Sequence, residues 1–270
     1  MPTFEELLDS DQLRVGYIQR KASAARMDAV GTQKEASTVP TTLGSSLDSL
    51  QYVITISFGT PPDTQTVLID TDSDVSWVQC VPCLQCHPQA DPLFDPSSSS
   101  TYSPFSCSSV ACLLLNEFGC SSSQCQYTVR SRRIPTYYFV VLEGITGNGQ
   151  LLDVAPSVFS AGGTILDSGT IITRLPPTAY AELSSAFKAA MVQYPAAPPR
   201  SLFDTCFEFT GLTSVTVPPV SLVFSGGAVV DLDPNGIIFN GCLAFAANRD
   251  DRSLGIIGNV QQRTFEVLYD

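Results

Sequence analysis

Most apolar residues of this chain fall into short runs typical of β-strands, separated by glycine, proline and serine. Residues 52–58 and 137–142 are rich in β-branched and aromatic side chains. Residues 66–69 form an apolar run that ends at Asp70. Two further runs within residues 220–232 flank a pair of glycines and predict a hairpin. The pattern therefore predicts a chain that is mostly β.

Two other stretches carry apolar residues at the three- and four-residue spacing of a helix. The first lies within residues 1–30 and contains Phe4, Leu7, Leu8, Val15 and Ile18. The second follows a proline pair, and we expect Thr178 to be its N-cap. Its apolar face consists of Tyr180, Leu183, Phe187 and Met191. Residues 36–49 are small and polar and predict a linker.

The composition is typical of a globular protein that binds neither nucleic acid nor a membrane. Hydrophobic residues make up 44% of the 270 residues, and no apolar run reaches the roughly 18 residues that a membrane helix needs. The net charge of −12 repels phosphate backbones. The basic cluster Arg130, Arg132 and Arg133 is short and lies beside a proline, so we expect a solvated loop there.

Nine cysteines, most of them between Cys80 and Cys125, indicate either disulfides in an oxidising compartment or a metal site. Cys80, Cys83 and Cys86 form a CxxCxxC run that could hold zinc. A closed zinc site needs four ligands, and the only histidine, His87, adjoins the run. We therefore favour disulfides and expect no metal. An odd number of cysteines leaves one thiol unpaired.

The start of the chain does not resemble a secretory signal peptide. Its first ten residues include Glu5, Glu6 and Asp9, so they are acidic where a signal peptide is basic and too polar for its apolar region. The cysteines suggest export, whereas this segment does not. We expect no signal peptide in this chain.

The most informative feature is an internal duplication. Residues 67–73 and residues 164–170 share an apolar strand that delivers an aspartate, Asp70 in the first copy and Asp167 in the second. A hydroxyl residue, a small or polar residue and another hydroxyl residue follow each aspartate. A single copy is more typical of a turn. Two copies in one β-rich chain indicate a pair of carboxylates with a shared function.

Paired carboxylates have a specific chemistry. When two carboxyls face each other, their like charges raise the pKa of one, so that the pair shares a proton. The ionised member can then take a proton from water while the protonated member polarises a substrate carbonyl. We predict Asp70 and Asp167 as this dyad, with carboxyl oxygens near hydrogen-bond distance, about 3 Å. The supporting residues are Thr71, Ser73, Ser168, Gly169 and Thr170, of which Ser73 and Thr170 would bond the outer carboxylate oxygens.

Other catalytic classes fit poorly. One histidine and the absence of a GxSxG motif argue against a serine triad. The chain also carries no glycine loop of the kind that cradles phosphates.

Four motifs resemble those of the nepenthesin-type, pepsin-like aspartic proteases of plants. They are residues 70–80 (DTDSDVSWVQC), 94–102 (FDPSSSSTY), 167–170 (DSGT) and 254–265 (LGIIGNVQQRTF). The resemblance covers about residues 50–270. It implies an all-β (minor α), bilobal pepsin-like fold with one aspartate per lobe, and an endopeptidase that cleaves polypeptides at acid pH. It further implies no cofactor, a monomer, and the secretory pathway or an extracellular location.

The resemblance also divides the chain. Residues 1–49 resemble the end of a pro-segment and a linker, residues 50–130 a truncated first lobe, and residues 131–270 the second lobe. It implies the disulfides Cys80–Cys83, Cys107–Cys125, Cys112–Cys120 and Cys206–Cys242. Cys86 would then be free, because its partner falls in a stretch that this chain lacks.

The sequence departs from the family in its first lobe. Asp72 stands where the family has glycine, which adds bulk and a like charge next to Asp70. After Val129 the family continues into a flap hairpin and the first lobe's counterpart of residues 254–258, but this chain does not. The family pattern also continues past Asp270 with a strand and a cysteine.

The resulting interpretation is an aspartic endopeptidase family member with an incomplete first lobe, from which we expect little or no peptide hydrolysis. Two alternatives remain open. One is a catalytically dead pepsin-fold protein that binds or inhibits a partner. The other is a mis-spliced or mispredicted product without a function of its own.

Overall fold

A computed structural model describes residues 3–22, 39–73, 76–83, 85–113, 118–127, 137–263, 265 and 267. The chain forms two compact units. The first comprises Met1–Ile54, Leu68–Asp74 and Pro135–Asp270, and the second comprises Thr55–Val67 and Val75–Ile134. The basic cluster at residues 130–133 lies outside the described residues.

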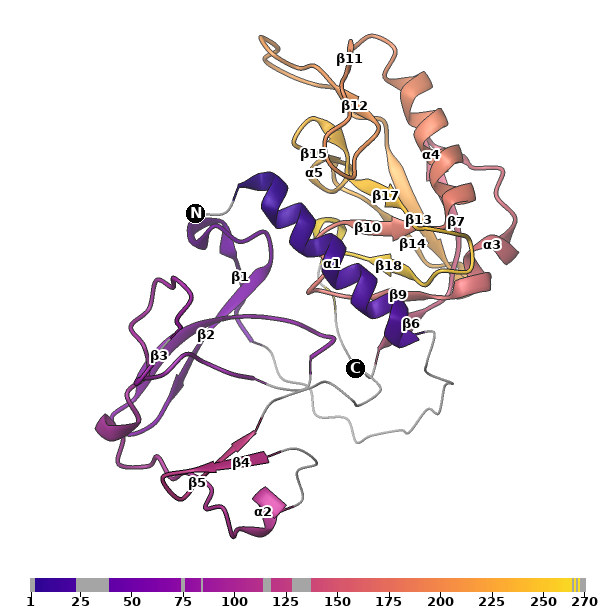
Figure 1. Ribbon diagram of the computed structural model, residues 1–270. Helices are drawn as coiled ribbons and strands as arrows, with labels where there is room; N and C mark the ends of the chain where they lie inside the picture. Colours follow the sequence, from indigo (N-terminus) through magenta and orange to yellow (C-terminus); the bar gives the residue numbers. More distant parts are fainter. Residues whose placement is uncertain are drawn as a thin grey trace. The chain divides into compact units, whose positions relative to one another are not determined.

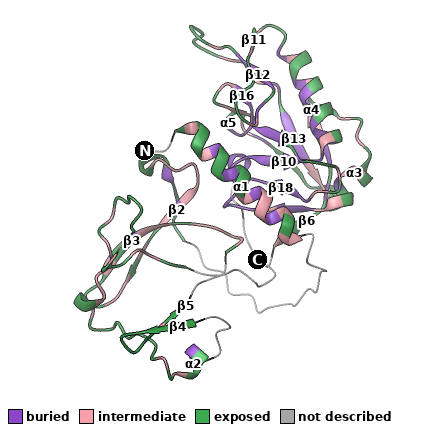
Figure 2. Cartoon of the chain, in the orientation of Figure 1, coloured by how far each residue is buried: buried purple, intermediate pink, exposed green. Residues whose placement is uncertain are grey.

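The centre of the first unit is a five-stranded sheet in the order β17-β10-β18-β9-β6 (Figure 1). The strands are β6 (Tyr138–Val140), β9 (Thr164–Leu166), β10 (Thr173–Leu175), β17 (Phe245–Ala247) and β18 (Gly255–Ile257). Strand β18 runs parallel to β9, and β10 runs parallel to β17, whereas β10 and β18 are antiparallel. The sheet is mixed, and most of its residues are buried (Figure 2).

Two four-stranded sheets also belong to the first unit. One has the order β14-β13-β7-β8, with β7 (Leu142–Gly147), β8 (Gln150–Leu151), β13 (Val220–Phe224) and β14 (Val229–Asp231). The other has the order β11-β12-β16-β15, with β11 (Ala196–Ala197), β12 (Cys206–Phe207), β15 (Ile238–Phe239) and β16 (Cys242–Leu243). The predicted hairpin within residues 220–232 is confirmed by the antiparallel pairing of β13 with β14.

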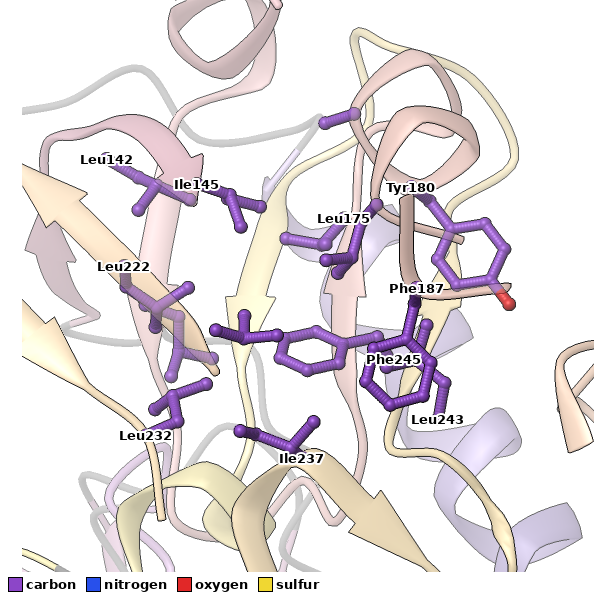
Figure 3. Close-up of a cluster of buried hydrophobic side chains, with 14 of the residues drawn as sticks. Leu142, Ile145, Leu175, Tyr180, Phe187, Leu222, Leu232, Ile237, Leu243 and Phe245 are labelled. Carbon is purple, nitrogen blue, oxygen red and sulfur yellow. The ribbon is translucent and has the colours of Figure 1, made fainter. Parts of the chain in front are cut away.

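The helices of this unit are α1 (Phe4–Ala22), α3 (Pro156–Gly162), α4 (Pro177–Ala190), α5 (Pro234–Ile237) and α6 (Asn259–Gln262), with the short 3-10 turns η1 (Gly44–Leu47) and η3 (Ser225–Gly227). The predicted apolar face of α4 is confirmed, because Tyr180, Leu183, Phe187 and Met191 are all buried. They pack with Ile145, Leu222 and Phe245 in the largest hydrophobic cluster (Figure 3).

The prediction of Thr178 as N-cap is wrong. Helix α4 begins at Pro177, and the residue at its N-cap, Pro176, has no side chain that can accept a hydrogen bond. Thr178 instead donates its N–H to Asp251 at 3.0 Å and its hydroxyl to the same carboxylate at 2.6 Å. The cap therefore comes from a residue distant in sequence, which a local pattern does not reveal.

The remaining strands are β1 (Thr42–Leu43), β2 (Tyr52–Phe58) and β3 (Asp63–Leu68), which form one sheet, and β4 (Phe118–Ser121) and β5 (Gln124–Tyr127), which form a two-stranded ribbon. Of these strands, β2 and β3 correspond to runs predicted from the sequence, whereas β1 lies in the segment predicted to be a linker. The short helices η2 (Pro96–Ser98) and α2 (Val110–Leu113) lie in the same part of the sequence. Strand β2 covers the predicted residues, whereas β3 starts earlier than predicted. Strands β4 and β5 are largely exposed (Figure 2).

Three of the four implied disulfides differ in the structure. It pairs Cys83 with Cys86, Cys107 with Cys120, and Cys112 with Cys125, and it leaves Cys80 free and exposed. These observations correct the pairs Cys80–Cys83, Cys107–Cys125 and Cys112–Cys120 and the free Cys86; only Cys206–Cys242 agrees. Cys120 and Cys125 face each other across β4 and β5, so each lies within reach of the same neighbouring segment, and spacing alone cannot choose the partner.

The two compact units do not coincide with the three-part division of the sequence. Helix α1 and the Asp70 loop belong to the same unit as residues 135–270. The division into a pro-segment and two lobes rests on the family pattern and stays a prediction. No helix among the described residues has both the length and the apolar character needed to cross a membrane.

Candidate active site

The second aspartate lies in a tight loop at the end of β9. Asp167 has a side chain only 1% exposed, and its N–H donates to the carbonyl of Ile257 at 3.1 Å. Its carboxylate accepts the N–H of Gly169 at 2.9 Å and the hydroxyl of Thr170. The loop therefore fixes both carboxylate oxygens.

The first aspartate lies in a loop of the same design. The chain before it is held by the N–H of Ile69, which donates to the carbonyl of Tyr52 at 2.9 Å. The N–H of Asp72 donates to the carboxylate of Asp70 at 3.0 Å, which repeats the bond that Gly169 makes in the second loop. Asp72 in place of glycine therefore leaves this loop hydrogen bond in place. The N–H of Ser73 donates to the Asp70 carbonyl at 3.2 Å; the role expected of its hydroxyl stays a prediction.

The residues after the two aspartates bind each other. The N–H of Thr71 donates to the Ser168 hydroxyl at 3.2 Å, and the N–H of Ser168 donates to the Thr71 hydroxyl at 3.1 Å. The Ser168 hydroxyl also lies 3.3 Å from the carbonyl of Ile69. This exchange joins the two loops directly, although they are distant in sequence.

Residues 254–258 pack beside the second loop. Strand β18 pairs with β9, and Asn259 donates to the carbonyl of Ser168 at 3.2 Å. Gly258 has no room for a side chain, because a Cβ there would lie 2.7 Å from the carbonyl oxygen of Ile171. The glycine is thus required by the close approach of two backbones.

A residue that the sequence pattern did not single out, Arg14 of α1, connects the two aspartates. Its guanidinium donates to both oxygens of Asp70, at 2.8 and 2.6 Å, and to both oxygens of Asp167, at 3.0 and 3.2 Å. This is the bidentate geometry in which arginine binds carboxylates most strongly. Burial alone would lower the pKa of Arg14, but the charges of Asp167 and Asp70 raise it.

Asp70 and Asp167 therefore lie close together, as predicted, but they do so through an intervening arginine. The two carboxylates share one guanidinium, whereas we expected them to bond each other. The sequence did contain a signal: Arg14 lies four positions before Ile18 and three after Asp11 in the amphipathic segment, beside its apolar face. Nothing in that pattern tells which acidic partner it meets.

Asp72 adds a third carboxyl to the site. Its side chain is 5% exposed, and its Oδ2 lies 3.8 Å from Arg14. Within the described part of the chain, its Oδ1 is buried without a hydrogen-bond partner. The pKa of Asp72 is raised to about 7, mainly by burial and then by the charges of Asp167 and Asp70. The positive charge of Arg14 lowers this pKa and offsets part of the rise.

Gly169, the counterpart of Asp72, is the point of closest approach. A Cβ at Gly169 would lie 2.5 Å from Arg14 Nη2 and 2.6 Å from Asp70 Oδ1. The glycine therefore leaves just enough space for the guanidinium between the two carboxylates.

The described residues contain no group of three or more histidine, cysteine or acidic side chains placed to hold a metal ion. In the CxxCxxC run, Cys83 and Cys86 are bonded to each other, so they are not available as thiolate ligands.

Two family descriptions match the chain. The family described as "Xylanase inhibitor N-terminal" matches residues 52–162, and the family described as "Xylanase inhibitor C-terminal" matches residues 137–270.

Several curated proteins are similar over most of the chain. An aspartyl protease family protein of Arabidopsis thaliana is 32% identical over 379 aligned residues, which cover 100% of this chain and 80% of the relative. Aspartyl protease AED1 of the same plant is 32% identical, with 98% and 79% covered. Aspartic proteinase nepenthesin-2 of Nepenthes gracilis is 26% identical, with 82% and 75% covered. The first alignment exceeds the 270 residues of this chain by 109 positions, which agrees with an internal deletion.

A solved structure described as "Crystal structure of edgp" is similar in fold, with a TM-score of 0.57 and 15% identity over 83% of this chain and 89% of that one.

Proposed function

The chain belongs to the plant aspartyl protease family, and from this premise we propose that Asp70 and Asp167 are its catalytic dyad, held silent by Arg14. The fold is all-β and pepsin-like. One observation carries the proposal: the two duplicated Asp loops converge on a single guanidinium in the first unit. The reaction class is hydrolysis of peptide bonds in polypeptide substrates.

The proposed chemistry follows from the positions of the two carboxyls. When Arg14 leaves, two carboxyls remain side by side, and their mutual repulsion favours a state in which they share one proton. The ionised carboxyl takes a proton from a water molecule, whose oxygen attacks the peptide carbonyl carbon. The protonated carboxyl donates to the carbonyl oxygen as the tetrahedral intermediate forms. The carboxyl that took the proton from water then gives it to the leaving nitrogen as the C–N bond breaks, and a hydroxyl of the intermediate returns its proton to the other carboxylate. The shared proton is thereby restored, and no covalent enzyme intermediate is needed.

The supporting residues have separate roles in this proposal. The backbone N–H groups of Asp72 and Gly169 each bind one inner carboxylate oxygen, at 3.0 and 2.9 Å. Thr170 binds the outer oxygen of Asp167, and Ser73 is proposed to do the same for Asp70. The exchange between Thr71 and Ser168 fixes the spacing of the loops. Positioning of this kind supplies a large part of the rate enhancement of such a site.

With α1 docked, the proposed site cannot work. Arg14 occupies the space between the carboxylates where the attacking water would bind, and its guanidinium bonds all four of their oxygens. We therefore expect the chain in this conformation to hydrolyse little or no peptide. The missing flap, which would exclude water and orient a peptide, acts in the same direction.

The test is digestion of a denatured protein substrate at about pH 3–4, where a shared-proton dyad operates. We expect no measurable cleavage by the wild-type chain and weak cleavage by Arg14→Ala. That cleavage must disappear in Arg14→Ala/Asp167→Ala and in the presence of a transition-state analogue that carries a hydroxyl in place of the attacking water. Cleavage that survives Asp167→Ala would overturn the dyad.

A second candidate function is a catalytically dead binding or inhibitor protein. Asp72 in place of glycine and the occupied dyad favour it. Its signature in the same assay is an Arg14→Ala variant as inactive as the wild type. The matching families carry the words xylanase inhibitor in their descriptions, so a xylanase is the first partner to try in a pull-down with the intact chain.

The four disulfides support a role in an oxidising compartment, and we place the protein in the secretory pathway or outside the cell. A monomer that takes no cofactor fits the proposed chemistry.

A further inference from the structure

Helix α1 lies against the central sheet of its own unit (Figure 1). The buried residues of the helix are Leu8, Asp11, Val15 and Ile18, spaced three and four apart as an amphipathic helix in a groove requires. Leu8 packs in a cluster with Ile171 and Ile172 of the loop before β10. Val15 and Ile18 pack with residues of β9 and β18 in another cluster. The helix is therefore part of the hydrophobic core of the unit.

The polar member of this face makes a buried ion pair. Asp11 accepts from Arg174 Nη2 at 2.9 Å, and the two side chains are 0% and 1% exposed. The carboxylate of Asp11 also accepts the backbone N–H groups of Ile171 at 2.5 Å and Ile172 at 3.4 Å. Arg174 belongs to β10, between β17 and β18 in the sheet. A charge buried there requires a carboxylate, and α1 supplies it.

A second polar anchor lies near the end of the helix. Gln19 accepts the N–H of Leu254 at 2.8 Å and donates to the carbonyl of the same residue at 2.6 Å. Its amide also lies 3.3 Å from the side-chain oxygen of Asn248. The helix is thus bound by backbone and side-chain groups on both sides of Arg14.

These contacts give this face of the first unit a chemical preference. We propose that this face of the first unit is a binding groove for an aspartate-bearing amphipathic helix, that Arg174 selects the aspartate, and that α1 remains its occupant after the chain is cut behind it. Departure of α1 would expose Leu8, Val15 and Ile18 to water and remove the counter-charge of Arg174. A cut between α1 and β1 therefore produces a two-chain protein, with the dyad still occupied by Arg14. This binding of α1 does not depend on whether the dyad can hydrolyse peptides.

The experiment uses the full chain with the recognition sequence of a site-specific protease inserted at residues 28–33. After complete cleavage, we expect the α1 fragment to co-elute with the remainder in size-exclusion chromatography at pH 7, and to separate from it in 8 M urea. Separate elution of the wild-type fragment under native conditions would overturn the proposal. Either outcome is compatible with an active and with an inactive dyad, so the experiment tests α1 binding separately from the proposed function.

The role of Arg174 is tested by a matched pair of substitutions on the same helix. Asp11→Ala removes the buried carboxylate, whereas Asp9→Ala removes an exposed one. The fragment should dissociate about 100-fold or more readily in Asp11→Ala than in Asp9→Ala, because a buried arginine is left unpaired. Equal retention in both variants would remove Arg174 from the proposal. If Asp11→Ala does not fold, hydrogen exchange of α1 amides in the uncut wild-type chain tests whether α1 is firmly bound to this face. Protection equal to that of β9 and β18 supports the groove, and rapid exchange contradicts it.

Discussion

Thr71 and Ser168 exchange hydrogen bonds, each through its backbone N–H to the side-chain hydroxyl of the other, at 3.2 and 3.1 Å. The two residues occupy equivalent positions in the duplicated sequence, one after each aspartate. The exchange is therefore approximately symmetric, and it joins two loops whose aspartates carry like charges. It opposes the repulsion between Asp70 and Asp167 together with Arg14 and the hydrogen bonds within each loop.

The first prediction concerns this exchange. Thr71→Ala and Ser168→Ala should each lower the free energy of unfolding by about 1–2 kcal/mol, because each leaves a partly buried N–H without its acceptor. The double variant should lose less than the sum of the single losses, with a coupling of roughly 0.5–1 kcal/mol. Urea unfolding curves measure all three. Thr71→Ser keeps the hydroxyl and is the control; strictly additive losses would show that the two bonds are independent.

A second prediction concerns the space at Gly169. In Gly169→Ala the new Cβ would lie 2.5 Å from the Arg14 guanidinium, so Arg14 must leave its position between the carboxylates. We expect a loss of about 1–3 kcal/mol in stability and faster hydrogen exchange in α1. Gly119→Ala is the control, since a Cβ at that position would lie 3.9 Å from its nearest neighbour, the carbonyl oxygen of Gln126. Unchanged exchange in α1 would mean that the site adapts without moving Arg14.

A third prediction follows from Asp72. Its pKa is raised to about 7 in the folded chain, from an ordinary value of 3.8. Below about pH 4 the carboxyl is protonated in both states, and above pH 7 it is ionised in both. Between these limits the folded chain holds a proton that the unfolded chain has released, so stability falls as the pH rises.

The slope from this one carboxyl reaches at most about 1.4 kcal/mol per pH unit. Urea unfolding of the wild type and of Asp72→Asn, measured every half unit across this window, isolates the contribution. The difference in stability between the two should grow in favour of Asp72→Asn as the pH rises. A constant difference would show that Asp72 titrates near its ordinary pKa.

A fourth prediction concerns the cysteines. Titration of the denatured, unreduced protein should find one reactive thiol, and Cys80→Ser should abolish it. Peptide mapping should recover Cys107 linked to Cys120 and Cys112 linked to Cys125. A reactive thiol that persists in Cys80→Ser, or the linkage of Cys107 to Cys125, would restore the pairing implied by the family pattern.

The sequence by itself determined the class of the fold and the position of the two aspartates. Periodicity placed β2, the hairpin of β13 and β14, and the buried face of α4, because local patterns of apolar residues decide which faces are buried. The duplicated strand and Asp motif identified Asp70 and Asp167, because the same short-range design recurs at each site.

Only the tertiary structure decided which residues pair in disulfides, helix caps and ion pairs. Spacing could not choose among the disulfide pairings, and the cap of α4 came from Asp251 in a distant segment. The helical pattern of residues 4–22 was visible in the sequence. The ion pairs that this helix makes, Arg14 with the dyad and Asp11 with Arg174, were not. An ion pair depends on which charges the fold brings within a few ångströms of each other, and the sequence pattern does not give that distance.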